Sequence, residues 1–266
     1  MARVIVITSG KGGVGKTTTT SNLGMALARL DHNTLLIDAD VGLRNLDLLL
    51  GLENRVIYTG LDVLNETCRL EQALITDKRQ SKLTFFPLSS NQYKSSITKS
   101  EIQKLVDLLS PKYDFILIDS PAGIDEGFQT AISSANEAII VVTPEVPSIR
   151  DADKVIGLLR SQGITNNKLV INRIRPNMVK TEDMMSITDV KNILGIPVIG
   201  VIPDSEQVII ASNRGEPLVL EDNLSLPGLA FENTAHRLDG QDIEMLDLNK
   251  ISSKNPVKRI LKNLFK

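Results

Sequence analysis

A glycine-rich segment near the N-terminus has the residue types and spacing of a phosphate-binding loop. The pattern G-x-x-x-x-G-K-[ST] is matched in full by Gly10, Lys11, Gly12, Gly13, Val14, Gly15, Lys16 and Thr17. Glycines let backbone N–H groups curl around phosphate oxygens with no Cβ in the way. Lys16 is expected to place a cation on the β- and γ-phosphates, Thr17 to offer its hydroxyl to Mg²⁺, and Thr18 to bind nucleotide beside them. The motif predicts a Mg²⁺-dependent ATP hydrolase, and the alternative is a chance glycine turn.

A carboxylate follows one of the apolar runs that come after this loop. Asp119 closes the run at residues 115–119 and is expected at the carboxyl end of a strand, beside the phosphates. That place suits the Mg²⁺-associated role of a Walker B aspartate, whereas the alternative is an aspartate that caps a helix. The turn at residues 120–123 could sense the γ-phosphate.

Two further carboxylates lie close together beyond another run. Asp38 and Asp40 follow residues 34–37, and like charges at this spacing crowd unless a metal, a lysine or a water uses them. We assign Asp38 to the neighbourhood of Mg²⁺ and Lys16, and Asp40 to orienting the attacking water. The alternative is a pair of turn-forming aspartates.

The elements that must position these side chains alternate along the chain. Short apolar runs typical of strands buried on both faces fall at residues 4–8, 34–38, 83–87, 115–119, 138–143, 169–172 and 198–202. Helical patterns fall between them, at residues 16–30, 99–109, 127–135, 149–162, 187–194 and 206–213. The alternation predicts a single-domain α/β P-loop fold over residues 1–238, with a mostly parallel twisted sheet and helices on both faces.

Composition narrows the class of protein. The 266 residues have a formal net charge of −2, which gives no global excess of positive charge for nucleic acid. The single Cys68 excludes an internal disulfide and a cysteine metal cluster within one chain. No segment has the roughly 20 apolar residues of a membrane-spanning helix. Because apolar residues begin at Val4 and lead straight into the glycine-rich loop, we expect no targeting peptide. We therefore expect synthesis in the compartment of action, either a bacterial cytoplasm or an organelle that makes its own proteins.

The last 28 residues of the chain differ from the rest in composition. Residues 239–255 are polar and rich in turn formers, which is typical of a linker, and residues 256–266 are expected to form a short amphipathic helix. Its apolar face, at spacing i, i+3, i+4, i+7 and i+8, consists of Val257, Ile260, Leu261, Leu264 and Phe265. Lysines and Arg259 fill the other face. A basic amphipathic helix of this kind binds an anionic membrane surface, and the alternative is a helix docked on the protein's own core.

The second lysine of the loop carries a family resemblance. The sequence K-G-G-V-G-K-T, beginning at Lys11, resembles the deviant Walker A loop of the ParA/MinD ATPases. The segments at residues 38–47, 119–124, 144–153, 201–204 and 211–217 are similar to the MinD group of that family. The resemblance implies an ATP-bound homodimer in which Lys11 reaches the partner's phosphate site. It also implies adenine contacts from Asn172, Pro203 and Asp204, a place for Glu145 near the ribose or the dimer interface, and a role in hydrolysis for Asp40.

The same resemblance implies a cellular role. MinD proteins place the division site by ATP-dependent dimerisation and reversible membrane binding, and they work with MinC, an inhibitor of FtsZ assembly, and with MinE, which stimulates hydrolysis. The expected location is the cytoplasmic face of a bacterial inner membrane, or the stroma and inner envelope of a plastid. The alternatives are a ParA-type DNA-segregation ATPase, which needs a basic patch and no lipid-seeking tail, and a scaffold that binds nucleotide without hydrolysing it.

Overall fold

The computed structural model describes residues 1–40, 44–88 and 97–248. One eight-stranded sheet lies at its centre, with strands in the order β3-β4-β2-β5-β1-β6-β7-β8. The strands are β1 (Arg3–Thr8), β2 (Thr34–Asp38), β3 (Ile75–Thr76), β4 (Leu83–Pro87), β5 (Phe115–Asp119), β6 (Glu137–Val142), β7 (Asn166–Ile174) and β8 (Val198–Pro203). All neighbours pair in parallel except β3, which runs antiparallel to β4 at the edge.

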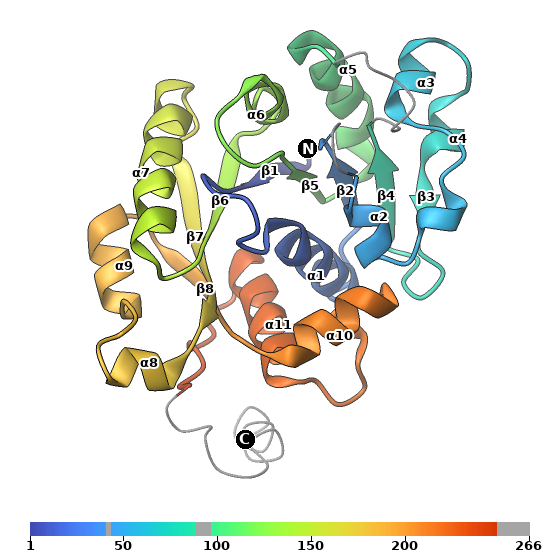
Figure 1. Cartoon of the computed structure of the whole chain (residues 1–266). Helices are drawn as coiled ribbons and strands as arrows, with labels where there is room; N and C mark the ends of the chain where they lie inside the picture. Colours follow the sequence, from blue (N-terminus) through green and yellow to red (C-terminus); the bar gives the residue numbers. More distant parts are fainter. Residues whose placement is uncertain (41–43, 89–96, 249–266) are drawn as a thin grey trace.

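Helices cover both faces of the sheet (Figure 1). The α-helices are α1 (Lys16–Arg29), α2 (Leu46–Leu49), α3 (Gly60–Leu64), α4 (Leu70–Ala73), α5 (Lys99–Leu109), α6 (Glu126–Ile132), α7 (Val146–Ser161), α8 (Pro176–Lys180), α9 (Ile187–Leu194), α10 (Glu206–Arg214) and α11 (Leu226–Leu238). The described residues also form three 3₁₀ turns: η1 (Glu53–Arg55), η2 (Ser110–Lys112) and η3 (Leu218–Leu220).

Alternate residues of each strand enter two separate cores. Ile116 and Ile118 of β5 face the core under α5, α6, α7 and α9, whereas Leu117 faces the core under α1 and α11. Because successive strand side chains point to opposite faces, a strand apolar throughout must be covered on both sides. The predicted α/β fold with a mostly parallel sheet is confirmed.

One long helix was not predicted. Helix α11 begins with Leu226, Pro227 and Gly228, and a proline followed by a glycine is typical of a turn. Proline is nevertheless tolerated in the first turn of a helix. Phe231 of this helix is fully buried, and the position of a Cβ on Gly200 of β8 would lie 2.5 Å from the Thr234 hydroxyl. The helix therefore closes tightly on β8.

The segment after α11 lies against the domain as far as the structure describes it. Arg237 donates to the carbonyls of Ile243 and Glu244, and Leu248 is buried beside Ile174 and Val201. The predicted linker began at residue 239, so its first part is attached to the domain and does not extend freely from it. Residues 249–266, including the predicted membrane face Val257, Ile260, Leu261, Leu264 and Phe265, lie outside the described residues. In the described part of the chain, no helix is both long and apolar enough to cross a membrane.

Candidate nucleotide-binding site

The glycine-rich loop connects β1 to α1 and is closed on one side and open on the other. A Cβ on Gly10 would lie 2.5 Å from the backbone carbonyl of Asp151 in α7, so only glycine fits there. Gly13 and Gly15 have φ values of 76° and 93°, in the left-handed region that favours glycine. A Cβ at Gly12 or Gly13 would meet no atom within 4 Å. The loop thus rests on α7 and leaves its other side accessible, as a phosphate cradle requires.

Lys16 and Asp119 form a buried ion pair beside this loop. Lys16 Nζ lies 3.2 Å from Asp119 Oδ1, and the two side chains are 9 % and 2 % exposed. Thr20 Oγ1 donates to the same carboxylate oxygen at 3.0 Å. Burial raises the pKa of Asp119, while Lys16 and the hydroxyls of Thr17 and Thr20 act to lower it. The sequence-predicted trio of Lys16, Thr17 and Asp119 is therefore brought together.

Asp38 occupies the neighbouring strand end. It is the Cα partner of Asp119 across the β2–β5 ladder, and its carboxylate accepts N–H groups from Asp40 at 3.0 Å and Leu46 at 3.2 Å. Burial and, next in importance, the nearby negative charge of Asp119 together raise the pKa of Asp38 to about 7. A carboxyl this costly to ionise is suited to a partner cation.

The predicted water-positioning residue, Asp40, lies directly beyond this strand end. It is half-buried, and its backbone N–H donates to the Asp38 carboxylate. The three residues that follow, 41–43, lie outside the described residues.

The residues fit a magnesium ion bound together with a nucleotide. In the described ranges, no cluster of three or more His, Cys, Asp or Glu could hold a metal by itself. Mg²⁺ commonly uses one or two protein oxygens, several waters and substrate phosphates. Thr17 and Asp119 supply such oxygens next to the loop, and Asp38 adds a carboxylate across the ladder.

The turn after β5 is connected to the phosphate loop. Gly123 N donates to Ser9 O at 3.2 Å, and Ser9 Oγ donates to Lys11 O at 3.0 Å. Gly123 has a φ of 91°, so this turn also depends on glycine. A displacement of the phosphate loop would therefore move the turn after β5 through these hydrogen bonds. This connection suits the predicted role of residues 120–123 as a γ-phosphate sensor.

The second lysine of the loop, Lys11, points to α7. Its Nζ lies 3.3 Å from Oε2 of Glu145, which immediately precedes that helix, and the two side chains are 43 % and 54 % exposed. Exposed ion pairs of this kind stabilise a fold by about 0–1 kcal/mol. Lys11 is therefore held weakly and at the surface, where a second molecule can reach it.

Asn172 lies against the phosphate loop. Its Nδ2 donates to Val14 O at 2.8 Å, and a Cβ on Gly15 would lie 2.2 Å from that nitrogen. The side chain is buried, and its Oδ1 accepts the N–H of Arg173 at 2.9 Å. Sequence reasoning placed Asn172 among the adenine contacts and did not identify this support of the loop.

The other two predicted adenine contacts lie at the end of β8. Pro203 is the Cα partner of Ile174 in β7 and is buried. Asp204 is exposed and accepts from both Nε and Nη2 of Arg175 at 2.7 Å. The three predicted adenine contacts thus lie at or near the carboxyl ends of the adjacent strands β7 and β8. The phosphate loop follows the carboxyl end of β1, at the same edge of the sheet.

A small recess opens between α1 and α10, close to Thr18. It holds only about 10 Å³, and its lining includes Thr18, Asn22, Val208, Ala211 and Pro217. Val208, Ala211 and Pro217 were not predicted as site residues, because the resemblance at residues 211–217 came without a site role for any of them. In this conformation the recess accepts a water and not a purine, so a base bound here would have to displace α10 side chains.

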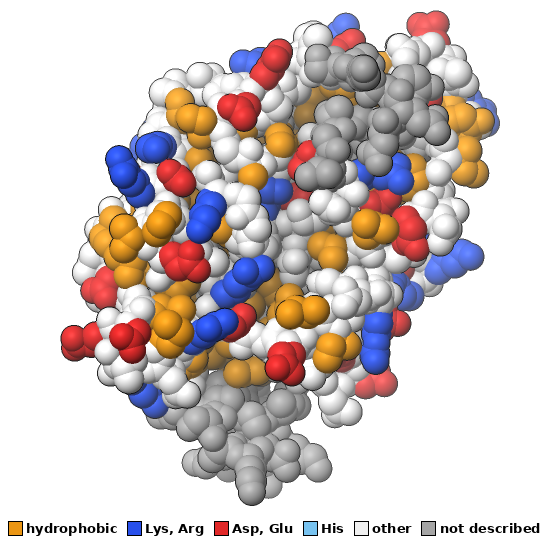
Figure 2. All heavy atoms as spheres, in the orientation of Figure 1, with side chains coloured by type: hydrophobic (Ala, Val, Ile, Leu, Met, Phe, Trp, Pro, Cys, Tyr) orange, Lys and Arg blue, Asp and Glu red, His pale blue; other side chains and the backbone are white. Residues whose placement is uncertain are grey.

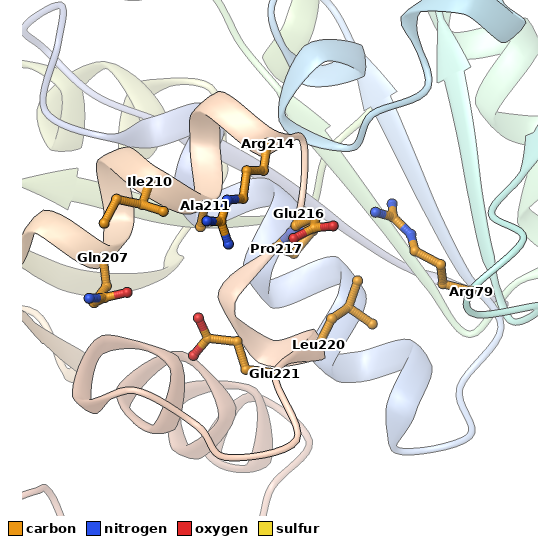
Figure 3. A pocket seen from close by; sticks show the side chains of 9 residues that line it. All are labelled: Arg79, Gln207, Ile210, Ala211, Arg214, Glu216, Pro217, Leu220 and Glu221. Carbon is orange, nitrogen blue, oxygen red and sulfur yellow. The ribbon is translucent and has the colours of Figure 1, made fainter.

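A larger pocket borders α10 and the η3 turn (Figure 3). It holds about 340 Å³ and is lined by Arg79, Gln207, Ile210, Ala211, Arg214, Glu216, Pro217, Leu220 and Glu221. None of these belongs to the phosphate loop. Arg79, at its edge, donates to Leu50 O and Gly215 O and pairs with Asp77. These bonds tie the end of α2 to the end of α10, which indicates a structural role for this arginine.

Comparison with known proteins agrees with this site. Residues 5–218 match the family model of the CobQ/CobB/MinD/ParA nucleotide binding domain. The chain is 71 % identical over 266 residues to the putative septum site-determining protein MinD of Emiliania huxleyi, with 100 % of this chain and 98 % of the relative covered.

Solved structures agree as well. The MinC:MinD cell division protein complex of Aquifex aeolicus matches with a TM-score of 0.86 and 50 % identity, covering 92 % of this chain and 98 % of that one. The septum site-determining protein MinD of Pyrococcus horikoshii, complexed with Mg-ADP, matches with a TM-score of 0.81 and 30 % identity, covering 96 % and 100 %.

Proposed function

Because the chain belongs to the MinD family of septum site-determining proteins, we propose that it is an ATP hydrolase whose turnover controls its attachment to a membrane. The observation that carries the catalytic part is the buried Lys16–Asp119 pair at the open phosphate loop. A buried cation and carboxylate without a ligand keep each other's charge compensated, and a bound phosphate gives the lysine a second anionic partner.

Each residue of the site has a separate role in hydrolysis. Lys16 and the loop N–H groups hold the β- and γ-phosphates, and Thr17 with Asp119 would hold a Mg²⁺ ion, which would neutralise charge on the phosphate oxygens. Asp38 keeps the segment after β2 in place through the N–H groups of Asp40 and Leu46. Asp40 then orients the attacking water.

ATP brings two copies together through the exposed loop face. Lys11, held only by an exposed pair with Glu145, leaves that partner and reaches the phosphates of the second copy. The dimer brings two C-terminal segments to one surface, and linking two weak binders raises overall affinity by about 10²–10⁴. The ATP dimer therefore binds anionic membrane, and hydrolysis releases it.

We also propose the partners and the place of action. The Aquifex relative was solved as a complex with MinC, which supports a MinC-like inhibitor as a partner of this chain and FtsZ assembly as the indirect target. A MinE-like activator is proposed from the family resemblance alone. Relatives from algae support a plastid location, at the stroma and inner envelope.

The test is vesicle sedimentation across nucleotide states. Asp40→Ala should bind ATP without hydrolysing it, form a dimer in size-exclusion chromatography and pellet with anionic vesicles. Removal of residues 256–266 should abolish pelleting and leave ATP binding intact. Phe265→Glu should act like the deletion, because a carboxylate on the apolar face enters the acyl boundary only at high cost. Asn263→Glu, on the predicted polar face, is the matched control and should bind vesicles better than Phe265→Glu.

Two outcomes would count against the proposal. Undiminished phosphate release by Asp40→Ala would remove this residue from the water-positioning role. A truncated protein that pellets as well as the intact one would remove the membrane cycle and favour a DNA-segregation ATPase or a soluble scaffold.

A further inference from the structure

An open groove lies between the start of α7, the short helix α8 and the start of α9. It encloses about 990 Å³, and its floor includes the half-buried Met178, Met184 and Met185 together with Val179. Methionine side chains are flexible and polarisable, so they adapt to irregular apolar partners. Three of them in one groove form an apolar surface that none of the described residues covers.

Acidic side chains border this floor. Glu182 and Asp183, on the connection from α8 to α9, and Asp189, in α9, line the groove and are exposed. Figure 2 shows acidic side chains over this connection, at the lower left, beside hydrophobic ones. Arg173 and Arg175 also line the groove, but Asp204 pairs with Arg175 at 2.7 Å. The α8–α9 rim thus suits a cationic partner with an apolar face.

The described chain ends next to this groove. Leu248 is buried in a small cluster that also includes Val179 and Met184, which line the groove. Residues 249–255 can span up to about 23 Å when extended. That reach lets residues 256–266 lie across α8 and enter the groove of the same molecule.

We propose that this groove is the docking site of the chain's own C-terminal segment, 256–266, in the monomer. Every charged residue of the segment is a lysine or an arginine, and its apolar residues recur at helical spacing. The cations face Glu182 and Asp183, and the apolar face lies on the methionines. Because the segment is tethered, its effective concentration at the groove is on the order of millimolar, so a weak contact is enough.

Docking makes membrane binding conditional, and this consequence rests on the proposed function. One end of the groove is formed by Glu145, Val146 and Pro147, and Glu145 is the partner of Lys11. An ATP dimer that takes Lys11 from Glu145 and covers this exposed end displaces the segment. The monomer therefore binds membrane weakly for two reasons: it has a single C-terminal segment, and that segment is docked in the groove.

Cysteine cross-linking tests the contact directly. In a Cys68→Ser background, Met185→Cys and Leu261→Cys should form an intramolecular disulfide in ADP, and far less of it when Asp40→Ala is added and ATP is supplied. The matched control replaces Met185→Cys by Ile209→Cys, which is 63 % exposed on α10 and should not cross-link. A disulfide that joins two chains instead would overturn the proposal in favour of a second copy as the occupant.

Charge reversal on the rim gives an independent measurement. Glu182→Lys with Asp183→Lys should raise vesicle binding in ADP about fivefold, as expected from losing two exposed ion pairs. Binding in ATP should not change. Asp107→Lys, at an exposed position on α5, is the control and should leave vesicle binding in ADP as in the wild type.

The results separate this inference from the proposed function. If truncation abolishes vesicle binding but no cross-link forms and rim reversal changes nothing, the docking site is wrong and the membrane cycle stands. If the cross-link forms in ADP but truncation leaves vesicle binding unchanged, the docking is right and the membrane cycle fails.

Discussion

Asp38 and Asp119 are direct neighbours at the carboxyl ends of β2 and β5, where they are Cα partners in the parallel ladder. Both are almost completely buried, at 3 % and 1 % exposure. Lys16 compensates the charge of Asp119, whereas the Asp38 carboxylate accepts hydrogen bonds from the backbone N–H groups of Asp40 and Leu46. The Asp38 carboxyl therefore keeps its proton to a higher pH than an ordinary aspartate does.

This relationship predicts how stability depends on pH. Folding raises the pKa of Asp38 to about 7, so the folded state binds its proton more tightly than the unfolded state. The stability from the neutral form is fully present below about pH 4 and is lost as the pH rises toward 7. The loss from this group is at most about 4 kcal/mol. Urea unfolding of the nucleotide-free protein between pH 4 and 8 measures it.

The control for this prediction is Asp38→Asn. The variant has no carboxyl to ionise, so its free energy of unfolding should change less between pH 4 and 8 than that of the wild type. It loses one of the two backbone bonds that Asp38 accepts, which is expected to cost about 1 kcal/mol at pH 5. Equal pH dependence in both proteins would show that Asp38 does not titrate in this range.

Lys16→Ala should abolish ATP binding. The substitution removes the cation at the β- and γ-phosphates and leaves Asp119 buried without its ion-pair partner. Calorimetry should show an affinity at least 100-fold below wild type, since hydrogen bonds from charged groups contribute about 1.5–3 kcal/mol each. Lys82→Ala, whose exposed pair with Asp31 is 3.4 Å long, is the control. Affinity near the wild-type value for Lys16→Ala would reject the phosphate-site assignment.

The strands and the loop could be predicted from the sequence because their signals are local. The strand bounds 34–38, 83–87 and 115–119 match β2, β4 and β5, since strands buried on both faces are apolar throughout. Helix α11 escaped prediction because Pro227 and Gly228 at its start are turn formers elsewhere. Its stability comes from packing on β8 and α1, which is tertiary information that local propensity does not contain.

The residues of the nucleotide-binding site also separate into those with a local sequence signal and those placed by tertiary packing. Lys16, Thr17 and Asp119 could be placed together because parallel strands end on one edge of the sheet. The contact of Asn172 with Val14 spans 158 positions in sequence and has no motif, and neither has the pairing of Lys11 with Glu145 in the same chain. Such contacts depend on how β7 and α7 are seated against the loop.

Lys11→Ala should prevent ATP-driven dimerisation without weakening the fold. The side chain makes one exposed ion pair, so its loss should change the free energy of unfolding by less than about 1 kcal/mol. Sedimentation velocity in Mg-ATP should show a monomer, whereas Glu145→Gln, which removes the other member of the pair, should still dimerise. An ATP-driven dimer of Lys11→Ala equal to wild type would remove this lysine from a role in trans.

Asn172→Ala should weaken nucleotide binding by loosening the loop and not by removing a contact to the base. Its amide holds the Val14 carbonyl, so the variant should lose about 1 kcal/mol of stability and bind ATP about tenfold more weakly. If loop support is the whole effect, ATP and GTP affinities should fall by the same factor in calorimetry, because both share the phosphates. A change in the ATP/GTP ratio would instead assign Asn172 to the adenine. The matched control is Asn167→Ala, a buried asparagine of the same strand whose amide donates to Ile164 O, away from the loop. It should lose comparable stability and keep full affinity for ATP, because the carbonyl it releases touches no part of the phosphate site.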